Sequence, residues 1–314
     1  MKKVLVSLCL AFGMAAATQA APAEKSPELK LITLGTKGGP SLLTSKRLAH
    51  SNVLMVGDDA YLIDAGYGAS LRLLEAGIPL KKIKGIFLTH LHSDHTLDYP
   101  ALLVNAWSTG LKTPIKVYGP KGIEQMHESA LKTYQIDIDQ RIDFENRPDL
   151  YKLIEINEMK EGEVFDNGTL KVSSIAVPHS PFEMGEAFAL KFEVGGKMIV
   201  SSGDVSYYPP LGDFAKNADI LLHEVVYPQG VANLVNRING SGGEDIAKAI
   251  LIHHTSARDV GKIAQKAQPT KLVLTHLIPA DDPDITDQTW IDMVNKEYQG
   301  DVVVAKDGME FLLD

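Results

Sequence analysis

Residues 88–95 read Leu-Thr-His-Leu-His-Ser-Asp-His and place three imidazoles and a carboxylate within six positions. The apolar run 86–88 predicts a buried strand, and His90 and His92, two residues apart, would then point to the same side of the chain. Asp94 and His95 follow where a turn could carry them round to a second ion. Imidazole nitrogens and carboxylate oxygens suit zinc or manganese. The segment therefore predicts a metal site at the end of a strand.

Three further predicted strand ends each carry one possible ligand, namely His179, Asp204 and His276. Any one of them alone is better explained as a capping residue or as a polar residue satisfied in the core. Together with the histidine cluster they predict a composite site at which several strand ends meet.

The order of these residues resembles the signature of the metallo-β-lactamase superfamily, which is His-x-His-x-Asp-His followed by a lone His, a lone Asp and a final His. The resemblance implies an α/β fold, the αββα sandwich, and two zinc ions, with manganese or iron as substitutes. Carried over by position, the ligands of one ion are His90, His92 and His179, those of the other are Asp94, His95 and His276, and Asp204 bridges the two.

Alternating strand and helix patterns agree with an α/β class. Strands are predicted at 29–34, 52–56, 61–64, 115–118, 170–177, 187–194 and 198–201, and helices at 69–76, 97–107, 123–134 and 257–267. The charged stretch 135–159 is interpreted as an irregular surface excursion. Because no linker composition marks a second domain, we expect one hydrolase domain over residues 24–314.

The first residues have the pattern of an export signal. Lys2 and Lys3 precede an apolar run, 4–17, that is too short to span a membrane comfortably, and small residues follow at 18–23. We expect residues 1–23 to be cleaved, which would leave a periplasmic or secreted protein without a membrane anchor. The single cysteine, Cys9, lies in this segment, so the mature protein should have neither disulfides nor thiol catalysis.

A bridged metal pair would activate a water for hydrolysis and could polarise an ester, lactone, phosphate or sulfate. The metal ligands alone do not choose among these substrates. Within the superfamily, the bridging Asp204 is typical of phosphodiesterases, sulfatases and lactonases rather than of zinc β-lactamases. Ser93, where flavin-coupled di-iron members have Glu, argues against an oxygen-reducing centre.

Two downstream motifs indicate help for the leaving group. His-Glu at 223–224 and His-His-Thr-Ser at 253–256 resemble motifs of the tRNase Z branch. The resemblance implies that Glu224 orients His254 and that His254 donates a proton to the leaving oxygen. With Asp94, these are the expected catalytic residues. Phe182 and several other aromatic residues near the ligands could line a pocket, although core packing is the favoured explanation for each of them.

The net charge of −9 and the scattered Lys and Arg residues argue against nucleic acid as a partner. The interval between His179 and Asp204 is also too short for the RNA-binding arm of tRNase Z. The segments 31–39, 61–66, 98–110 and 223–227 resemble the exported arylsulfatase-like branch. We therefore expect a small-molecule ester as substrate, no nucleic acid partner and, by family analogy, a homodimer.

The leading hypothesis is a binuclear zinc-dependent hydrolase of ester-type substrates, arylsulfatase-like or phosphodiesterase-like, that uses a metal-bridging hydroxide. A zinc β-lactamase or lactonase is the alternative. A non-catalytic metal-binding protein is a third hypothesis, which the complete ligand set disfavours.

Overall fold

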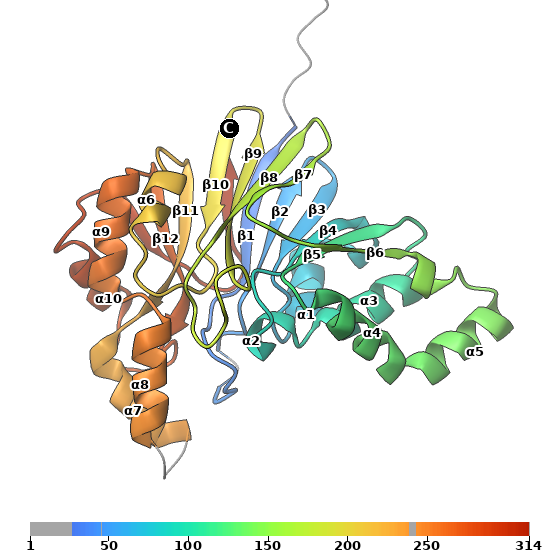
Figure 1. Cartoon of the computed structure of the whole chain (residues 1–314), viewed down its shortest axis with the longest axis horizontal. Coiled ribbons are helices and arrows are strands. Elements are labelled where there is room, and N and C mark those ends of the chain that lie inside the picture. The colour runs from blue at the N-terminus through green and yellow to red at the C-terminus, as the bar shows by residue number, and fades with distance from the viewer. Residues whose placement is uncertain (1–26, 45, 239–242, 314) are drawn as a thin grey trace, which may run out of the picture.

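Two seven-stranded sheets face each other at the centre of the molecule (Figure 1). The structure, a computed structural model, describes residues 27–44, 46–238 and 243–313, so the predicted signal peptide at 1–23 lies outside the described residues. The first sheet has the strand order β14 (Met309–Leu313), β1 (Leu29–Gly35), β2 (Ser51–Val56), β3 (Asp59–Ile63), β4 (Ile83–Phe87), β5 (Ile115–Gly119) and β6 (Ile154–Glu158). The second has the order β13 (Val302–Val304), β12 (Lys271–Ile278), β11 (Ile220–Val226), β10 (Lys197–Ser201), β9 (Phe188–Val194), β8 (Leu170–Ala176) and β7 (Gly162–Asp166).

Helices cover the outer face of each sheet (Figure 1). The first sheet packs against α1 (Ala69–Glu75), α3 (Tyr99–Ser108) and α4 (Ile123–Thr133), with α2 (Ser93–Thr96), α5 (Gln135–Glu145) and the 3-10 turns Leu80–Lys82 and Leu150–Lys152 alongside. The second packs against α6 (Pro210–Phe214), α9 (Ala257–Ala267) and α10 (Asp287–Val294). The remaining helices, α7 (Pro228–Ile238) and α8 (Gly243–His253), form a pair that projects from the loop end of the second sheet. These four layers confirm the predicted αββα sandwich.

Aromatic and aliphatic side chains fill the space between the sheets. Phe87 from the first sheet meets Phe192 from the second edge to face, with ring centroids 5.5 Å apart, and both side chains are buried. Alternation along each strand sends every second residue into this layer and the others toward the helices. Packing between the two sheets therefore fixes their relative position, independently of the loops at their ends.

The carboxyl ends of the central strands meet at one edge of the sandwich. Strands β3, β4 and β5 run parallel in the first sheet, and β10, β11 and β12 run parallel in the second. Loops that leave parallel strands at the same edge bring their side chains together. Gly203 permits one of these turns, since its φ is +57° and a Cβ there would lie 2.5 Å from the carbonyl oxygen of Phe188.

The structure contains elements that the sequence-based expectations lacked, and two of them show why. Residues 135–159 contain α5 and β6 rather than an irregular excursion. Their charged composition hides the pattern, because α5 buries only Ile138 fully and β6 is an edge strand stabilised by pairing with β5. The C-terminal strand β14 was not predicted, since it forms by pairing with β1 at the opposite end of the sequence.

Of the helices in the described ranges, none combines the length and the hydropathy needed to cross a bilayer.

The packing between the sheets predicts a large loss of stability for Phe192→Ala. The substitution removes a buried ring from a layer that cannot collapse around the cavity, so we expect the free energy of unfolding to fall by about 3 to 5 kcal/mol. Phe144→Ala is the matched control, because that side chain is 88% exposed on α5, and its loss should stay within about 0.5 kcal/mol. Urea unfolding followed by fluorescence measures both, and equal losses would contradict this account of the core.

Candidate metal centre

The first group of candidate ligands consists of three histidines and one carboxylate. Nε2 of His90 and Nε2 of His179 lie 3.0 Å and 3.1 Å from Nδ1 of His92. Oδ2 of Asp204 lies 3.8 Å from Nε2 of both His90 and His179. Nitrogens bound to one tetrahedral zinc ion are about 3.3 Å apart, given Zn–N bonds of about 2.0 to 2.1 Å. The spacing therefore fits four donors around a single ion.

The second group shares Asp204 with the first. Nε2 of His276 lies 3.2 Å from Oδ2 of Asp94 and 3.2 Å from Oδ2 of Asp204. Nε2 of His95 lies 3.3 Å from Oδ1 of Asp204 and 3.7 Å from Oδ2 of Asp94. The two groups thus contain the seven residues named from the sequence, divided as the resemblance implies, with Asp204 between them.

Unpartnered polar atoms in the second group fit a metal ion. Nε2 of His95 and Oδ1 of Asp204 are both buried and have no hydrogen-bond partner among the described residues. Buried polar atoms are almost always paired, so two that face each other without a partner indicate an ion between them. Nitrogen and oxygen donors in this number suit a divalent metal, with zinc the best match.

The pKa values of the histidines also indicate a metal ion at this site. Burial lowers the pKa of His90 well below its ordinary value and that of His179 to about 4, so both rings are neutral at pH 7 and have lone pairs free for a metal. Burial disfavours charge on His95 as well, yet the surrounding carboxylates, Asp204 most strongly, outweigh it and raise the pKa of His95. This part of the site therefore attracts positive charge, which an ion would supply.

Two of the ligand rings, those of His95 and His179, are held from behind by a second contact. Nδ1 of His95 lies 2.8 Å from Oδ2 of Asp64, and Nδ1 of His179 donates to the carbonyl oxygen of His253 at 3.0 Å. The backbone N–H of Thr89 donates to the other oxygen of Asp64 at 2.8 Å. Asp64 has a φ of 60° and His276 a φ of 45°, conformations that cost energy for residues other than glycine and that occur at functional sites. The fold therefore fixes the direction of the His95 and His179 rings.

Sequence reasoning missed three residues that adjoin the site. Buried His50 packs against the ring of His95 with centroids 5.0 Å apart, and its Nε2 lies 3.7 Å from Asp64. The backbone N–H of Gly39 donates to Asp94 at 2.9 Å, and Lys37 donates to the carbonyl oxygen of Gly39 at 2.7 Å. The unusual pairing of a lysine with the glycines at 38–39 is the one signal that the sequence offered.

Glu224 and His254 lie beside the shared carboxylate. Oε2 of Glu224 is 3.3 Å from Nδ1 of His254, and this nitrogen is 3.9 Å from Oδ2 of Asp204. The backbone N–H of Thr255 donates to Oε1 of Glu224 at 2.9 Å, which holds the carboxylate in place. Burial disfavours a charged His254, but Glu224 outweighs burial and raises the pKa of His254 to about 9. In this state His254 carries a proton at neutral pH.

A cavity of about 410 Å³ opens onto the two ligand groups. Its charged floor includes His92, Asp94, Asp204 and His254, and its wall is formed by apolar residues of α7 and α8. Of the aromatic residues singled out in the sequence, Phe182 lies against the ring of His92, with centroids 4.6 Å apart. The other aromatic residues singled out near the ligands are Trp107, which is buried in a core, Tyr208 and Tyr227, which pack against a core, and Tyr207, which is 45% exposed.

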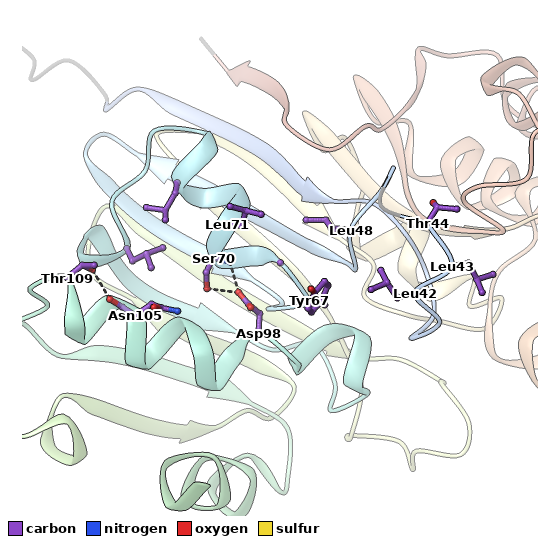
Figure 2. Close-up of a pocket in the computed structure, with 13 residues that line it drawn as sticks. Leu42, Leu43, Thr44, Leu48, Tyr67, Ser70, Leu71, Asp98, Asn105 and Thr109 are labelled. Atoms are coloured by element: carbon purple, nitrogen blue, oxygen red, sulfur yellow. Dashed lines mark hydrogen bonds between the residues drawn. The ribbon is translucent and has the colours of Figure 1, made fainter. Parts of the chain in front are cut away.

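A larger cavity of about 660 Å³ lies elsewhere, between residues 42–44 with Leu48 on one side and the helices α1 and α3 on the other (Figure 2). Leucines dominate its lining, and Ser70 and Asp98 form a hydrogen bond of 2.5 Å at its base. No member of the two ligand groups lines it. The smaller cavity is therefore the one in which metal chemistry could occur.

Known proteins with similar chains and folds carry the same architecture. A curated ribonuclease Z from Mycobacterium bovis is 28% identical over 282 residues, which cover 89% of this chain and 96% of that protein. The metallo-β-lactamase fold protein YhfI from Bacillus subtilis superposes with a TM-score of 0.66 at 20% identity, covering 91% of this chain and 100% of that one. The short form of human tRNase Z gives a TM-score of 0.60 at 20% identity and covers 90% and 98%.

These relatives correct one expectation from the sequence. Nucleic acid was excluded as a partner, but the curated relative is by name a ribonuclease and the match extends over nearly its whole length. The exclusion was wrong because it used the net charge of the chain and the shortness of one interval. A phosphate at a metal centre is neutralised locally by the ions, so the sign of the distant surface charge does not decide whether it binds.

The family model described as Anti-Pycsar protein Apyc1 matches residues 29–278. This range contains all seven candidate metal ligands together with Glu224 and His254. The chain therefore belongs to the Anti-Pycsar protein Apyc1 family, within the metallo-β-lactamase fold superfamily.

Proposed function

We propose that the protein is a metal-dependent phosphodiesterase with a binuclear zinc centre. The observation that carries the proposal is the position of Asp204, whose carboxylate faces both ligand groups and lies 3.9 Å from the protonated ring of His254. A centre for an attacking group and a proton donor for a leaving group thus face the same cavity. Hydrolysis of an ester with a poor leaving group requires both.

The residues of the site have different roles in the proposed reaction. When bound, two divalent ions supply a hydroxide near neutral pH and offset the charge of a phosphoryl group. Asp94 and Asp204 provide the carboxylates of the site. Asp94 is held in position because its Oδ2 accepts a hydrogen bond from the backbone N–H of Gly39. Glu224 keeps the ring of His254 oriented and charged, and His254 delivers its proton to the leaving oxygen.

The curated relative and the proton donor His254 both favour a phosphodiester over the other esters as the substrate. The curated relative is a ribonuclease, which cleaves a phosphodiester bond. A protonated histidine assists departure of an alkoxide, such as a ribose oxygen, far more than departure of a phenolate. The cavity of about 410 Å³ suits a nucleotide-sized molecule or the end of an RNA chain. Sulfate esters and lactones are weaker candidates with the same site.

A substrate panel with an isosteric variant tests the proposal. Zinc-loaded protein should hydrolyse bis-p-nitrophenyl phosphate faster than p-nitrophenyl sulfate, a lactone or nitrocefin. Asp204→Asn should lower kcat on every substrate by more than about a hundredfold and reduce bound zinc, since loss of even an outer partner of a ligand costs about 10- to 100-fold.

Asp166→Asn is the control, because its carboxylate is exposed on β7 and belongs to neither ligand group. It should leave both activity and metal content unchanged. Full activity of Asp204→Asn, or a preference for the sulfate, would rule out the proposed phosphodiesterase.

The role of His254 predicts an effect that depends on the leaving group. His254→Ala should lower kcat/KM for a dinucleotide by about a hundredfold or more, and hardly at all for bis-p-nitrophenyl phosphate, since nitrophenolate needs no proton. His253→Ala is the control, because His253 holds His179 through its backbone carbonyl. Equal losses of His254→Ala on the two substrates would refute the proton donor.

The pH profile provides an independent check. His254 is an acid only while protonated, so its contribution is present below its pKa and is lost as the pH rises through that value. With the pKa raised to about 9, the dinucleotide reaction should decline on the alkaline side near or below pH 9, because nearby metal ions lower the value. The decline should be absent from His254→Ala and weak for the nitrophenyl ester in rate measurements across pH 6 to 10.

We also propose that the protein is exported and that its first 23 residues are removed. Expression of the full chain in a Gram-negative host should yield a periplasmic species whose N-terminus falls near residue 24, by mass spectrometry of the intact protein. Replacement of both Lys2 and Lys3 by Glu should retain the longer form in the cell. An unprocessed N-terminus in the active protein would contradict export.

A further inference from the structure

His50 is a buried histidine beside the candidate metal centre that belongs to neither of the two ligand groups described above. It lies directly before β2 and is 2% exposed, and its Nδ1 has no hydrogen-bond partner among the described residues. A buried polar atom without a partner costs free energy, so an apolar residue would be less costly at this position. The presence of an imidazole here therefore needs an explanation from its surroundings.

The ring of His50 contacts both histidine ligands of the second group. Its centroid lies 5.0 Å from that of His95, at an interplanar angle of 44°, and 5.4 Å from that of His276, at 74°. Its Nε2 lies 3.7 Å from Oδ2 of Asp64, the same oxygen that lies 2.8 Å from Nδ1 of His95. All four side chains are buried. His50 therefore packs against two ligands and against the carboxylate that orients one of them.

The ring of His276 depends on such packing more than the rings of His95 and His179 do. The Nδ1 atoms of those two rings have hydrogen-bond partners, whereas Nδ1 of His276 is buried without one among the described residues. A ligand ring without a hydrogen bond at its rear is oriented by the side chains packed against it. The rings of His50 and His254 both pack against His276, each with centroids 5.4 Å away. Of these two, His50 also packs against His95, so it can fix the two ligands relative to each other.

Backbone contacts hold His50 against the turn that carries the ligands. The N–H of Gly66 donates to the carbonyl oxygen of His50 at 3.1 Å, and the N–H of Ala65 donates to that of His95 at 2.7 Å. A Cβ at Gly66 would clash with the carbonyl oxygens of both His50 and Asp94, so glycine is required for these segments to lie so close together. The backbone of His50 therefore cannot move away from the ligands without breaking these contacts.

The histidines of the first group are supported by a different ring. Phe182 packs against His90, His92 and His179, with centroids 5.6, 4.6 and 6.0 Å away. Within the described residues, the ring contacts of Phe182 are all with histidines of the first group, and those of His50 are all with histidines of the second. The two groups of ligands thus have separate aromatic supports.

We propose that His50 is a positioning residue for the second ion, the one whose ligands are Asp94, His95 and His276. Its ring fixes the spacing and direction of the two histidine ligands by packing, and His50 does not itself bind the ion. The inference rests on the proposed binuclear centre. It adds that each ion has its own support, so that the binding of one ion can be weakened without the other.

Zinc affinity measured at one group at a time tests the inference. His179→Ala lacks a ligand of the first group and should bind one ion in the second, whereas Asp94→Ala should bind one ion in the first. Competition with a chromophoric chelator gives the zinc Kd of each variant. Addition of His50→Ala should weaken zinc binding about 10- to 100-fold in the His179→Ala protein, and by no more than about twofold in the Asp94→Ala protein.

Two further substitutions separate ring packing from other causes. His50→Phe keeps a buried ring without the nitrogens, so the zinc Kd of the second group should stay within about threefold of its value with histidine. Phe182→Ala is the matched control, because it removes a ring that packs against ligands of the first ion, and it should weaken zinc binding in the first group alone. His50→Asn also removes the ring and repeats the test if the alanine variant does not fold.

The outcomes distinguish this inference from the proposed function. Wild-type protein that binds fewer than two zinc ions contradicts the binuclear centre, and the role of His50 with it. If the wild type binds two, selective weakening of the second group by His50→Ala, with recovery in His50→Phe, supports the role. Unchanged binding, equal weakening of both groups, an equal loss in His50→Phe, or an equal loss in the second group from Phe182→Ala would overturn the role of His50 and leave the binuclear centre standing.

Discussion

The structure depends on burying a carboxylate among histidines at the junction of two sheets. Asp204 is 2% exposed and lies within 3.8 Å of ring nitrogens from four histidines. Burial alone would favour its neutral form, but His276 and His95 outweigh burial and hold the pKa of Asp204 well below its usual value. A charged group so deep in a protein requires compensating positive charge. Without a metal, protonated histidines provide it, and a metal ion would provide it in the functional protein.

The packing of the two sheets holds these residues in place. The ligands come from the ends of β4, β8, β10 and β12, which belong to both sheets, so the site exists only while the sheets face each other. The stacked aromatic residues between the sheets maintain that relation. Their packing free energy offsets the unfavourable backbone conformations of Asp64 and His276. Stability and function are thus separated in space, with packing in the middle of the sandwich and chemistry at its edge.

The relatives and the site together change the kind of substrate that should be considered. Whole-chain charge suggested a small ester and excluded nucleic acid, whereas a ribonuclease matches over 89% of the chain. Local chemistry bears on this difference, because the candidate metal ligands and apolar residues of α7 and α8 line the same cavity.

The sequence by itself determined the ligand types and their order, because a metal site needs particular donor atoms, and it indicated an α/β class, because strands and helices show their periods locally. The αββα arrangement was implied by the family resemblance. The sequence also predicted the pairing of Glu224 with His254, through resemblance. It could not show the strand β14, the helix α5 or the ring contact of His50, since each depends on neighbours distant in the sequence. The resemblance had also implied that Asp204 lies between the two ligand groups, but only the tertiary structure gave the distances that place it there and showed that apolar residues of α8 line the same cavity. The reason is physical: distances between strand ends are set by the packing of two sheets, and no local pattern encodes them.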